Sequence, residues 1–317
     1  MKIIFILICL TLMSSAVRLS VAEKLMPVAK KLHSMCLTET TEKLKNVEIL
    51  NALVCGEQLN NYSLNTLFIA TGLIHLLVVS GSHLNLLNRM INNLLTIINI
   101  ENKLNIHDSY QSLIQLCILF FYCLVCNFNP PIVRAFTFLC FIFLQEHLRI
   151  KFSLNHILIL AGLTCLAVES TWICSLSFQM SWLIHTISIF SSNAFQSRSK
   201  IKNQIAIYLA LIPTFHLLGF PPLNSIIISI VFSSAIEFIL FPLSFLTYFF
   251  NNLGFIFDLA CDALIRGLQF LETSIIPAVP TTQNIQINLL NWIIICSLHF
   301  ILELKITSDL RSKESLI

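Results

Sequence analysis

The sequence predicts an all-α fold, a polytopic transmembrane helical bundle with about 7–9 spans plus interfacial amphipathic helices. Composition is the first reason: 56% of the 317 residues are hydrophobic and 11% are charged, and the mean hydropathy is +0.82. Soluble domains carry about 25% charged residues, so this composition excludes a soluble protein. The second reason is that the apolar runs approach the roughly 20 residues that cross a bilayer, with polar or proline-containing segments between them.

Residues 1–22 are predicted to be either a signal peptide or the first membrane helix. Lys2 precedes an apolar run, Ile3–Met13, and the small residues Ser20 and Ala22 offer a cleavage site. Arg18 near the end of the run is compatible with an uncleaved helix. Both alternatives direct the chain to a membrane through a secretion system.

Residues 23–60 are the most polar part of the chain. Lysines and glutamates alternate there, while Leu32, Met35 and Cys36 recur at helical spacing, as do Leu44 and Val47. The pattern predicts one or two amphipathic helices outside the hydrocarbon, with the charges on a solvated face.

The next segment, residues 64–100, contains the stretch "HLLVVSGSH" (75–83). Its second half is too rich in asparagine to face lipid on all sides, although its apolar positions form one stripe. We therefore expect its polar face to meet protein, water or the membrane surface.

Seven apolar stretches follow, and "NPP" (129–131) and "GFPP" (219–222) interrupt the series. The stretches are Leu113–Phe128, Ile132–Leu144, Leu154–Val168, Ile173–Phe190, Ile205–Leu218, Ile226–Phe250 and Ile287–Leu304. Before the last one, residues 253–276 place Asp258, Asp262 and Arg266 on one face and apolar residues on the other. This predicts an interfacial amphipathic helix with an Asp262–Arg266 pair. Residues 61–304 would thus be the membrane domain and 305–317 a cytoplasmic tail.

Basic residues give an orientation. Arg149 and Lys151 lie in one short loop and Arg198, Lys200 and Lys202 in another, two spans later. By the positive-inside rule this side is predicted to be cytoplasmic, which places "NPP" and "GFPP" at the outer face.

The eleven cysteines lie mostly in apolar runs, and their spacing indicates no disulfide framework. Cys123 and Cys126 form a C-x-x-C pair, but no strand precedes them. We expect the cysteines to act as small apolar packing residues.

Polar groups within spans are costly and by default mark function. The candidates are His75, Ser80, Ser82, His83, Arg134, Gln179, Ser181, His185, His216 and Glu237. Gly81 and the two flanking serines favour a broken helix between the histidines, lining a polar pathway. The alternative is a close-packed helix crossing with hydrogen-bonded histidines.

Arg134 keeps its charge in a protein. It must reach the interface, pair with an acid such as Glu237, or face water, and it could hold an anionic substrate, because arginine suits phosphate. Gln179 lies opposite Ser177 and Ser181 on its helix, where helix packing is the simpler interpretation.

Catalytic chemistry finds little support in these residues. No H-x-H or H-E-x-x-H motif occurs, so no metal and no cofactor are expected. Ser80 with His83 lacks the G-x-S-x-G elbow. The sequence predicts a protein that is not an enzyme, with an intramembrane serine hydrolase as an alternative.

Four motifs in order resemble the ComEC family. "GLIHLLVVSGSHL" (72–84) is similar to its signature, and "CGEQLNNYSL" (55–64) is similar to the lead-in to that signature. "FNPPIVRAF" (128–136) and "LSFQMSW" (176–182) are similar to two later elements. "LALIPTFHLLGFPPLN" and "EFILFPLSFL" fit more loosely. Departures concern mainly glycines: Asn85 and Ser177 replace two of them, and Ser82 replaces a leucine.

The resemblance implies an inner-membrane channel core that takes up single-stranded DNA in natural transformation, with residues 61–304 as the ComEC-like competence domain. His75, Ser80, Gly81 and His83 would line the channel, and Arg134 would meet the phosphates. Phe178, Gln179 and Ser181 would support this core, and Glu237 is placed with them.

The resemblance also implies partners: single-stranded DNA, the lipid bilayer, and competence-machinery proteins such as a DNA receptor and separate nuclease or ATPase subunits. A homo-oligomer is compatible with it. The family's OB-like and nuclease domains are not expected in this chain, so a degenerate or repurposed membrane transporter or assembly partner is the alternative.

Overall fold

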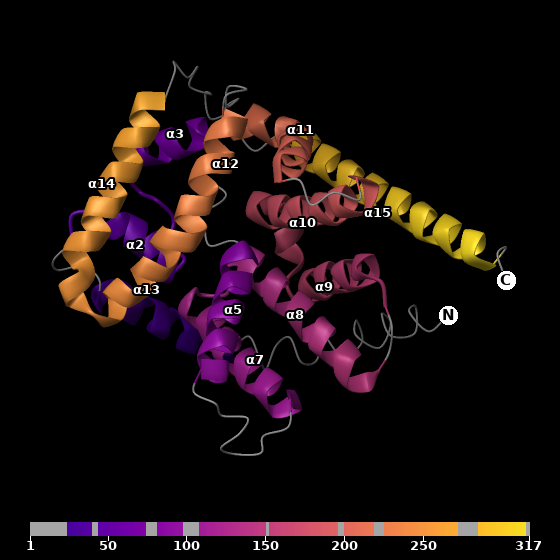
Figure 1. Ribbon diagram of the computed structural model, residues 1–317, viewed down its shortest axis with the longest axis horizontal. Helices are drawn as coiled ribbons and strands as arrows, with labels where there is room; N and C mark the ends of the chain where they lie inside the picture. The colour runs from indigo at the N-terminus through magenta and orange to yellow at the C-terminus, as the bar shows by residue number, and fades with distance from the viewer. Residues whose placement is uncertain are drawn as a thin grey trace.

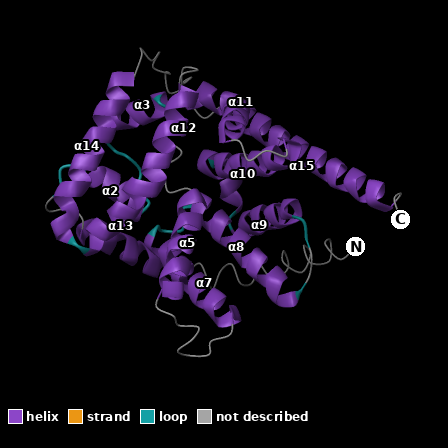
Figure 2. Ribbon diagram, viewed as in Figure 1, coloured by secondary structure: helices purple, strands orange, loops and turns teal. Residues whose placement is uncertain are grey.

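The computed structural model describes residues 24–39, 44–73, 81–149, except 98–107, and then 152–195, 200–218, 225–271 and 285–314. These residues form helices and contain no strand, which confirms the all-α prediction (Figure 2).

A first helix covers residues 24–39. The following α-helices are α2 (Val47–Val54), α3 (Tyr62–Ala70), α5 (Gly81–Ile97), α7 (Asp108–Val125), α8 (Pro130–Leu148), α9 (Leu154–Val168), α10 (Leu176–Phe195), α11 (Lys200–Leu218), α12 (Ser225–Ala235), α13 (Phe241–Phe249), α14 (Gly254–Leu271) and α15 (Ile285–Glu314). Short elements are η1 (Ser170–Cys174), η2 (Ile236–Leu240) and η3 (Asn251–Leu253).

Three apolar clusters hold together the helices, whose arrangement is shown in Figure 1. One joins α2 and α3 to α12, α13 and α14, and another joins α9, α10, α11 and α15. Between these two halves, α5, α7 and α8 share the third cluster. The centre of the molecule is therefore the place where α5, α8 and α10 approach one another.

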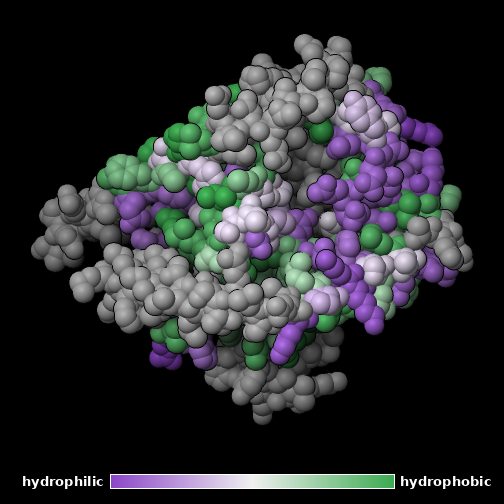
Figure 3. All heavy atoms as spheres, turned by 180° about the vertical axis from the view of Figure 1, so that it is seen from behind, coloured by the Kyte–Doolittle hydropathy of each residue, from purple (hydrophilic) through white to green (hydrophobic). Residues whose placement is uncertain are grey.

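Two helical segments, Pro130–Leu148 and Ser225–Phe249, are long and apolar enough to cross a membrane. Shorter apolar helices are Gln111–Val125, Leu154–Val168 and Ile201–Ile212. The count of about 7–9 spans stays a prediction. Seen from behind, polar residues gather on the half that holds α2, α3 and α14 (Figure 3).

The predicted stretch Ile226–Phe250 is a helix with one widened turn. Its residues form α12, the π-helical turn η2 and α13. Pro242 explains the turn, because its ring excludes the carbonyl of the preceding helical turn and it has no N–H to donate. Glu237 lies on this π turn, and such turns occur often at functional sites.

The interfacial interpretation of residues 253–276 is wrong for the apolar face. In α14 that face, including Phe257, Cys261 and Leu268, is buried in the cluster shared with α2 and α13. Asp262 pairs with Lys45, Nζ to Oδ2 2.6 Å, and not with Arg266. The helix spacing was correct, but the pattern could not show that a protein core, and not lipid, would cover it.

The expectation that the cysteines only pack is also corrected. Cys36 and Cys55 form a disulfide, with their Cα atoms 6.0 Å apart. It joins the helix of residues 24–39 to the residue that follows α2, and these are two helices where the spacing of residues 23–60 predicted one or two. Cys123, Cys126 and Cys165 are buried thiols, as expected of packing residues.

Candidate functional site

The buried guanidinium of Arg134 is the centre of the candidate site. Arg134 lies in the second turn of α8, a helix that starts on Pro130 and Pro131, where proline favours helix initiation. Only 2% of the residue is exposed, and Arg134 is the largest fully buried side chain among the described residues. The short "NPP" turn sets where α8 begins and therefore where Arg134 lies in the interior.

Two residues of α10 hold the guanidinium. Its Nε–H and Nη2–H both donate to Ser181 Oγ, at 3.0 and 2.9 Å, and Nη1–H donates to His185 Nδ1 at 3.3 Å. Because the guanidinium only donates, Nδ1 of His185 carries no proton and the imidazole is neutral. Phe138 packs edge-on against that ring, with centroids 4.6 Å apart.

The predicted pairing of Arg134 with Glu237 is not formed. The hydrogen-bond partners of Arg134 in the described part of the chain are Ser181 and His185, and neither is an acid. Equal depth along two helices did not bring Glu237 to Arg134, because α10 lies there instead. Three of the five guanidinium N–H groups donate to these two side chains, and neither acceptor is a carboxylate that would balance the positive charge.

Gly81 faces this charge as the first residue of α5. A Cβ atom at Gly81 would lie 3.1 Å from Ala135 Cβ and 3.7 Å from Arg134 Nη2. The first backbone N–H groups of a helix have no partner within the helix and carry partial positive charge. The glycine therefore lets this helix end approach the guanidinium closely.

His83 lies in the first turn of α5. Its ring is fully buried and stacks on Phe241 of α13, with centroids 4.5 Å apart and planes 5° apart. His83 thus links the signature segment to the start of α13, where Pro242 lies. His75 and Ser80 lie outside the described residues, as do the side chains of Ser82 and His216.

The remaining motif residues of α10 face away from Arg134. Gln179 is fully buried, donates from Nε2 to the carbonyl of Ile173 at 2.7 Å, and accepts from Asn291 of α15 at 3.1 Å. Phe178 is buried against Trp172 and Trp182. The "LSFQMSW" segment therefore has two faces: Ser181 serves Arg134, and Phe178 and Gln179 anchor α10 to its neighbours.

A buried hydrogen-bond chain that sequence reasoning missed runs from α10 through α15 to α9. Trp182 Nε1–H donates to His299 Nε2 at 2.9 Å, and His299 Nδ1–H donates to Asn155 Oδ1 at 2.6 Å. Asn155 Nδ2–H then donates to Glu303 at 3.3 Å. The signal available in the sequence was the spacing of Asn291, His299 and Glu303 on one face of the last apolar stretch.

No cluster of potential metal ligands occurs among the described residues.

Comparison with known proteins assigns the family. No curated protein and no solved structure matches the chain. The family model described as "Competence protein" matches residues 53–305, well over half of the 317 residues, and includes α5, α8 and α10. The chain therefore belongs to the competence protein family, the ComEC family that the ordered motifs resemble, and so to a family of membrane proteins with a role in DNA uptake.

Proposed function

We propose that this protein is the membrane channel core through which single-stranded DNA passes in natural transformation, and that Arg134 contacts the phosphates of the strand. The single observation that carries this role is the buried guanidinium whose partners are neutral. A buried charge without an opposite charge is costly, so such groups are retained where a ligand supplies the counter-charge.

The ligand that best fits is a phosphodiester. Two guanidinium N–H groups remain beyond those bound to Ser181 and His185, and Gly81, the first residue of α5, has no Cβ at the position that would lie 3.7 Å from Arg134 Nη2. Arginine binds phosphate oxygens in a bidentate manner, and a helix N-terminus is a ready anion site. A single such site binds each phosphate alike, whatever the base, and therefore suits transport without sequence preference.

The proposed location is the bacterial inner membrane, crossed several times. Among the described residues, the two long apolar helices and the three shorter ones would give five crossings, and about 7–9 is the number that the sequence predicts. The proposal assigns no reaction, metal or cofactor to this chain. A DNA receptor, a nuclease or ATPase subunit and further copies of the chain are the partners we expect.

The test is uptake of labelled DNA into the cytoplasm by competent cells that carry variants at position 134. Arg134→Gln removes the charge, and we expect transformation to fall by at least about tenfold, since one lost charge-assisted contact is worth roughly 1.5–3 kcal/mol. Arg134→Lys keeps the charge but not the fork, and should be intermediate.

Arg149→Gln is the matched control, because Arg149 is an exposed cation at the far end of the same helix. Protein levels in the membrane are compared for all variants by immunoblot. Wild-type uptake with Arg134→Gln at normal abundance would contradict the proposal.

A further inference from the structure

The helix of residues 24–39 presents three exposed lysines that form no ion pair with the carboxylates of the described residues. Lys24, Lys30 and Lys31 are exposed, and none forms an ion pair with a described carboxylate. Of the acids described near this helix, Glu57 pairs with His33 at 2.9 Å, and Glu39 accepts from the hydroxyl of Tyr248 at 2.8 Å and keeps one negative charge against the three lysines. This surface is therefore positively charged.

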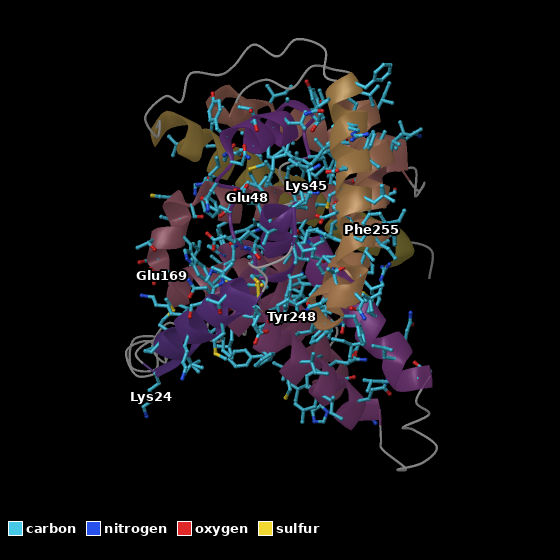
Figure 4. The ribbon with its side chains drawn as sticks, turned by 90° about the vertical axis from the view of Figure 1, so that its left-hand side faces the viewer. Lys24, Lys45, Glu48, Glu169, Tyr248 and Phe255 are labelled. Atoms are coloured by element: carbon cyan, nitrogen blue, oxygen red, sulfur yellow. A yellow bond between two sulfur atoms is a disulfide. The ribbon has the colours of Figure 1, made fainter. Side chains whose placement is uncertain are left out.

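The lysines alternate with apolar side chains along one face. Lys24, Val28, Lys31 and Met35 follow one another at spacings of four, three and four residues, which places them on one stripe of the helix. Val28 and Met35 are 46% and 49% exposed. The buried side of the same helix, with Ala29 and Cys36, is occupied by the protein, so this mixed stripe faces outward. Figure 4 shows Lys24 pointing away from the molecule at its edge.

The stripe is fixed next to the helix that carries Arg134. Cys36 is bonded to Cys55, and His33 Nδ1–H donates to the carbonyl of Val125, the last residue of α7, at 3.0 Å. Gly56 O accepts from Asn129, the N-cap residue of α8, at 3.5 Å. The helix is therefore held at the turn from which α8 runs inward to Arg134.

The side of the membrane on which this helix lies makes its lysines unusual. Disulfides persist in oxidising compartments, so the Cys36–Cys55 bond places the helix outside the cytoplasm. This agrees with the outer position predicted for "NPP". Lysines close to spans accumulate on the cytoplasmic side, so their presence here is not explained by membrane insertion and calls for another ligand.

We propose that the stripe formed by Lys24, Val28, Lys31 and Met35, with Lys30 beside it, is the receiving surface for incoming single-stranded DNA, ahead of Arg134. This inference rests on the proposed function. Phosphates would pair with the lysines and the faces of bases would lie against Val28 and Met35. Lys24 and Lys31 are about 10 Å apart along the axis, a reach of a few nucleotides. Sequence-independent binders of single strands combine positive charge with side chains, typically aromatic, on which the bases stack. In this stripe, Val28 and Met35 offer apolar surfaces in place of aromatic rings.

The test uses the full-length protein in nanodiscs of phosphatidylcholine and a fluorescent oligothymidylate. Changing Lys24, Lys30 and Lys31 together to Gln should weaken binding about tenfold or more and flatten the salt dependence by about 2 in log–log slope, since each phosphate contact on a single strand contributes roughly 0.7. Changing the exposed cations Arg89, Arg149 and Arg266 to Gln is the charge-matched control and should change binding little.

Amine acylation locates the contact directly. The oligonucleotide should protect Lys24, Lys30 and Lys31 from acylation in the wild-type protein. If affinity and salt slope stay unchanged in the triple variant, the proposal is overturned. Protection that requires phosphatidylglycerol in the disc, and not the oligonucleotide, overturns it in favour of a lipid headgroup.

Arg134→Gln separates the two proposals. We expect it to lower uptake in cells and total affinity in discs, while the oligonucleotide still protects Lys24, Lys30 and Lys31 from acylation. If the lysine variant binds normally while Arg134→Gln blocks uptake, the receiving surface fails and the channel proposal stands. If the wild-type protein binds no oligonucleotide and Arg134→Gln has normal uptake, both fail.

Discussion

Gly81 is the residue at which a single added methyl group reports most directly on the anion site. Its Cβ would approach Ala135 to 3.1 Å and lie 3.7 Å from Arg134 Nη2, part of the guanidinium that we propose contacts phosphate. Overpacking of this kind costs about 1–3 kcal/mol, and we expect Gly81→Ala to lower DNA uptake by roughly ten- to a hundredfold.

Gly267→Ala is a matched control for that substitution. Its Cβ would meet the ring of Phe232 at 3.3 Å, a similar crowding on α14, away from Arg134. Equal loss of transformation in both variants, at equal membrane abundance, would show that crowding in general, and not the anion site, explains the effect.

Gly162 has a different role, which concerns stability. A Cβ at this position of α9 would overlap the ring of Trp182, so the indole and the α9–α10 contact must shift. We expect Gly162→Ala to destabilise the purified protein by about 1–3 kcal/mol, seen as a lower midpoint of thermal unfolding in detergent. An unchanged midpoint would contradict the packing described for Trp182.

At the level of elements, the hydrogen-bond chain fixes the position of α15 against α9 and α10. Trp182 Nε1–H is always a donor, so His299 must accept at Nε2 and donate from Nδ1. His299→Leu leaves two buried polar groups without partners and should cost about 1–3 kcal/mol. His299→Gln offers one acceptor and one donor and should recover part of this loss.

The two His299 variants are compared by thermal unfolding followed by tryptophan fluorescence, because Trp182 and Trp292 both lie where α15 packs against α10 and the segment before it. Phe300→Leu, at an exposed position next in sequence, is the control. Identical unfolding of the Leu and Gln variants would mean that the ring volume of His299, and not its hydrogen bonds, matters.

A second set of hydrogen bonds joins the residues just before α2 to α14. Asp258 accepts the backbone N–H groups of Lys45 and Asn46, which lie just before α2, and Asp262 binds Lys45 Nζ and Asn46 Nδ2. The hydrogen bond from Lys45, followed by that from Asn46, holds the pKa of the Asp262 carboxyl below its usual value.

Acid should therefore weaken the hydrogen bonds that Lys45 and Asn46 make with Asp262. Because the pKa of Asp262 is lowered on folding, its contribution is complete above the ordinary aspartate pKa of about 3.9 and is lost as pH falls through the lower folded value. Limited proteolysis between the first helix and α2 should increase in that acid range for the wild type and be less dependent on pH in Asp262→Asn.

The sequence predicted much of the helix order, and the reasons are physical. Prolines and apolar periodicity located α8, α9 and the α12–α13 region closely, because both act within a few residues. The partners of Arg134 were not predictable, since depth along a helix does not show which neighbour faces it. The core side of α14 and the Cys36–Cys55 bond depend likewise on contacts between distant segments.

At the scale of the whole molecule, the disulfide and the positive-inside rule give the same orientation from unrelated observations. Cys36–Cys55 indicates an oxidising compartment for the first helix, and Arg149 indicates the cytoplasm for the end of α8. If both hold, a DNA strand would meet the lysine stripe first, pass the start of α8, and reach Arg134 before it approaches the basic loops.

This orientation can be tested by labelling intact cells with a charged, membrane-impermeant maleimide, after the exposed Cys117, Cys174 and Cys296 are replaced by serine. A cysteine at Lys24 should be labelled in intact cells, and one at Leu148, 52% exposed at the end of α8, only after the membrane is permeabilised. The opposite result would place the stripe in the reducing cytoplasm, where the disulfide would not persist and the lysines could be explained by the positive-inside rule alone. The order of DNA contacts would then be reversed, so this experiment fixes the direction of the proposed path.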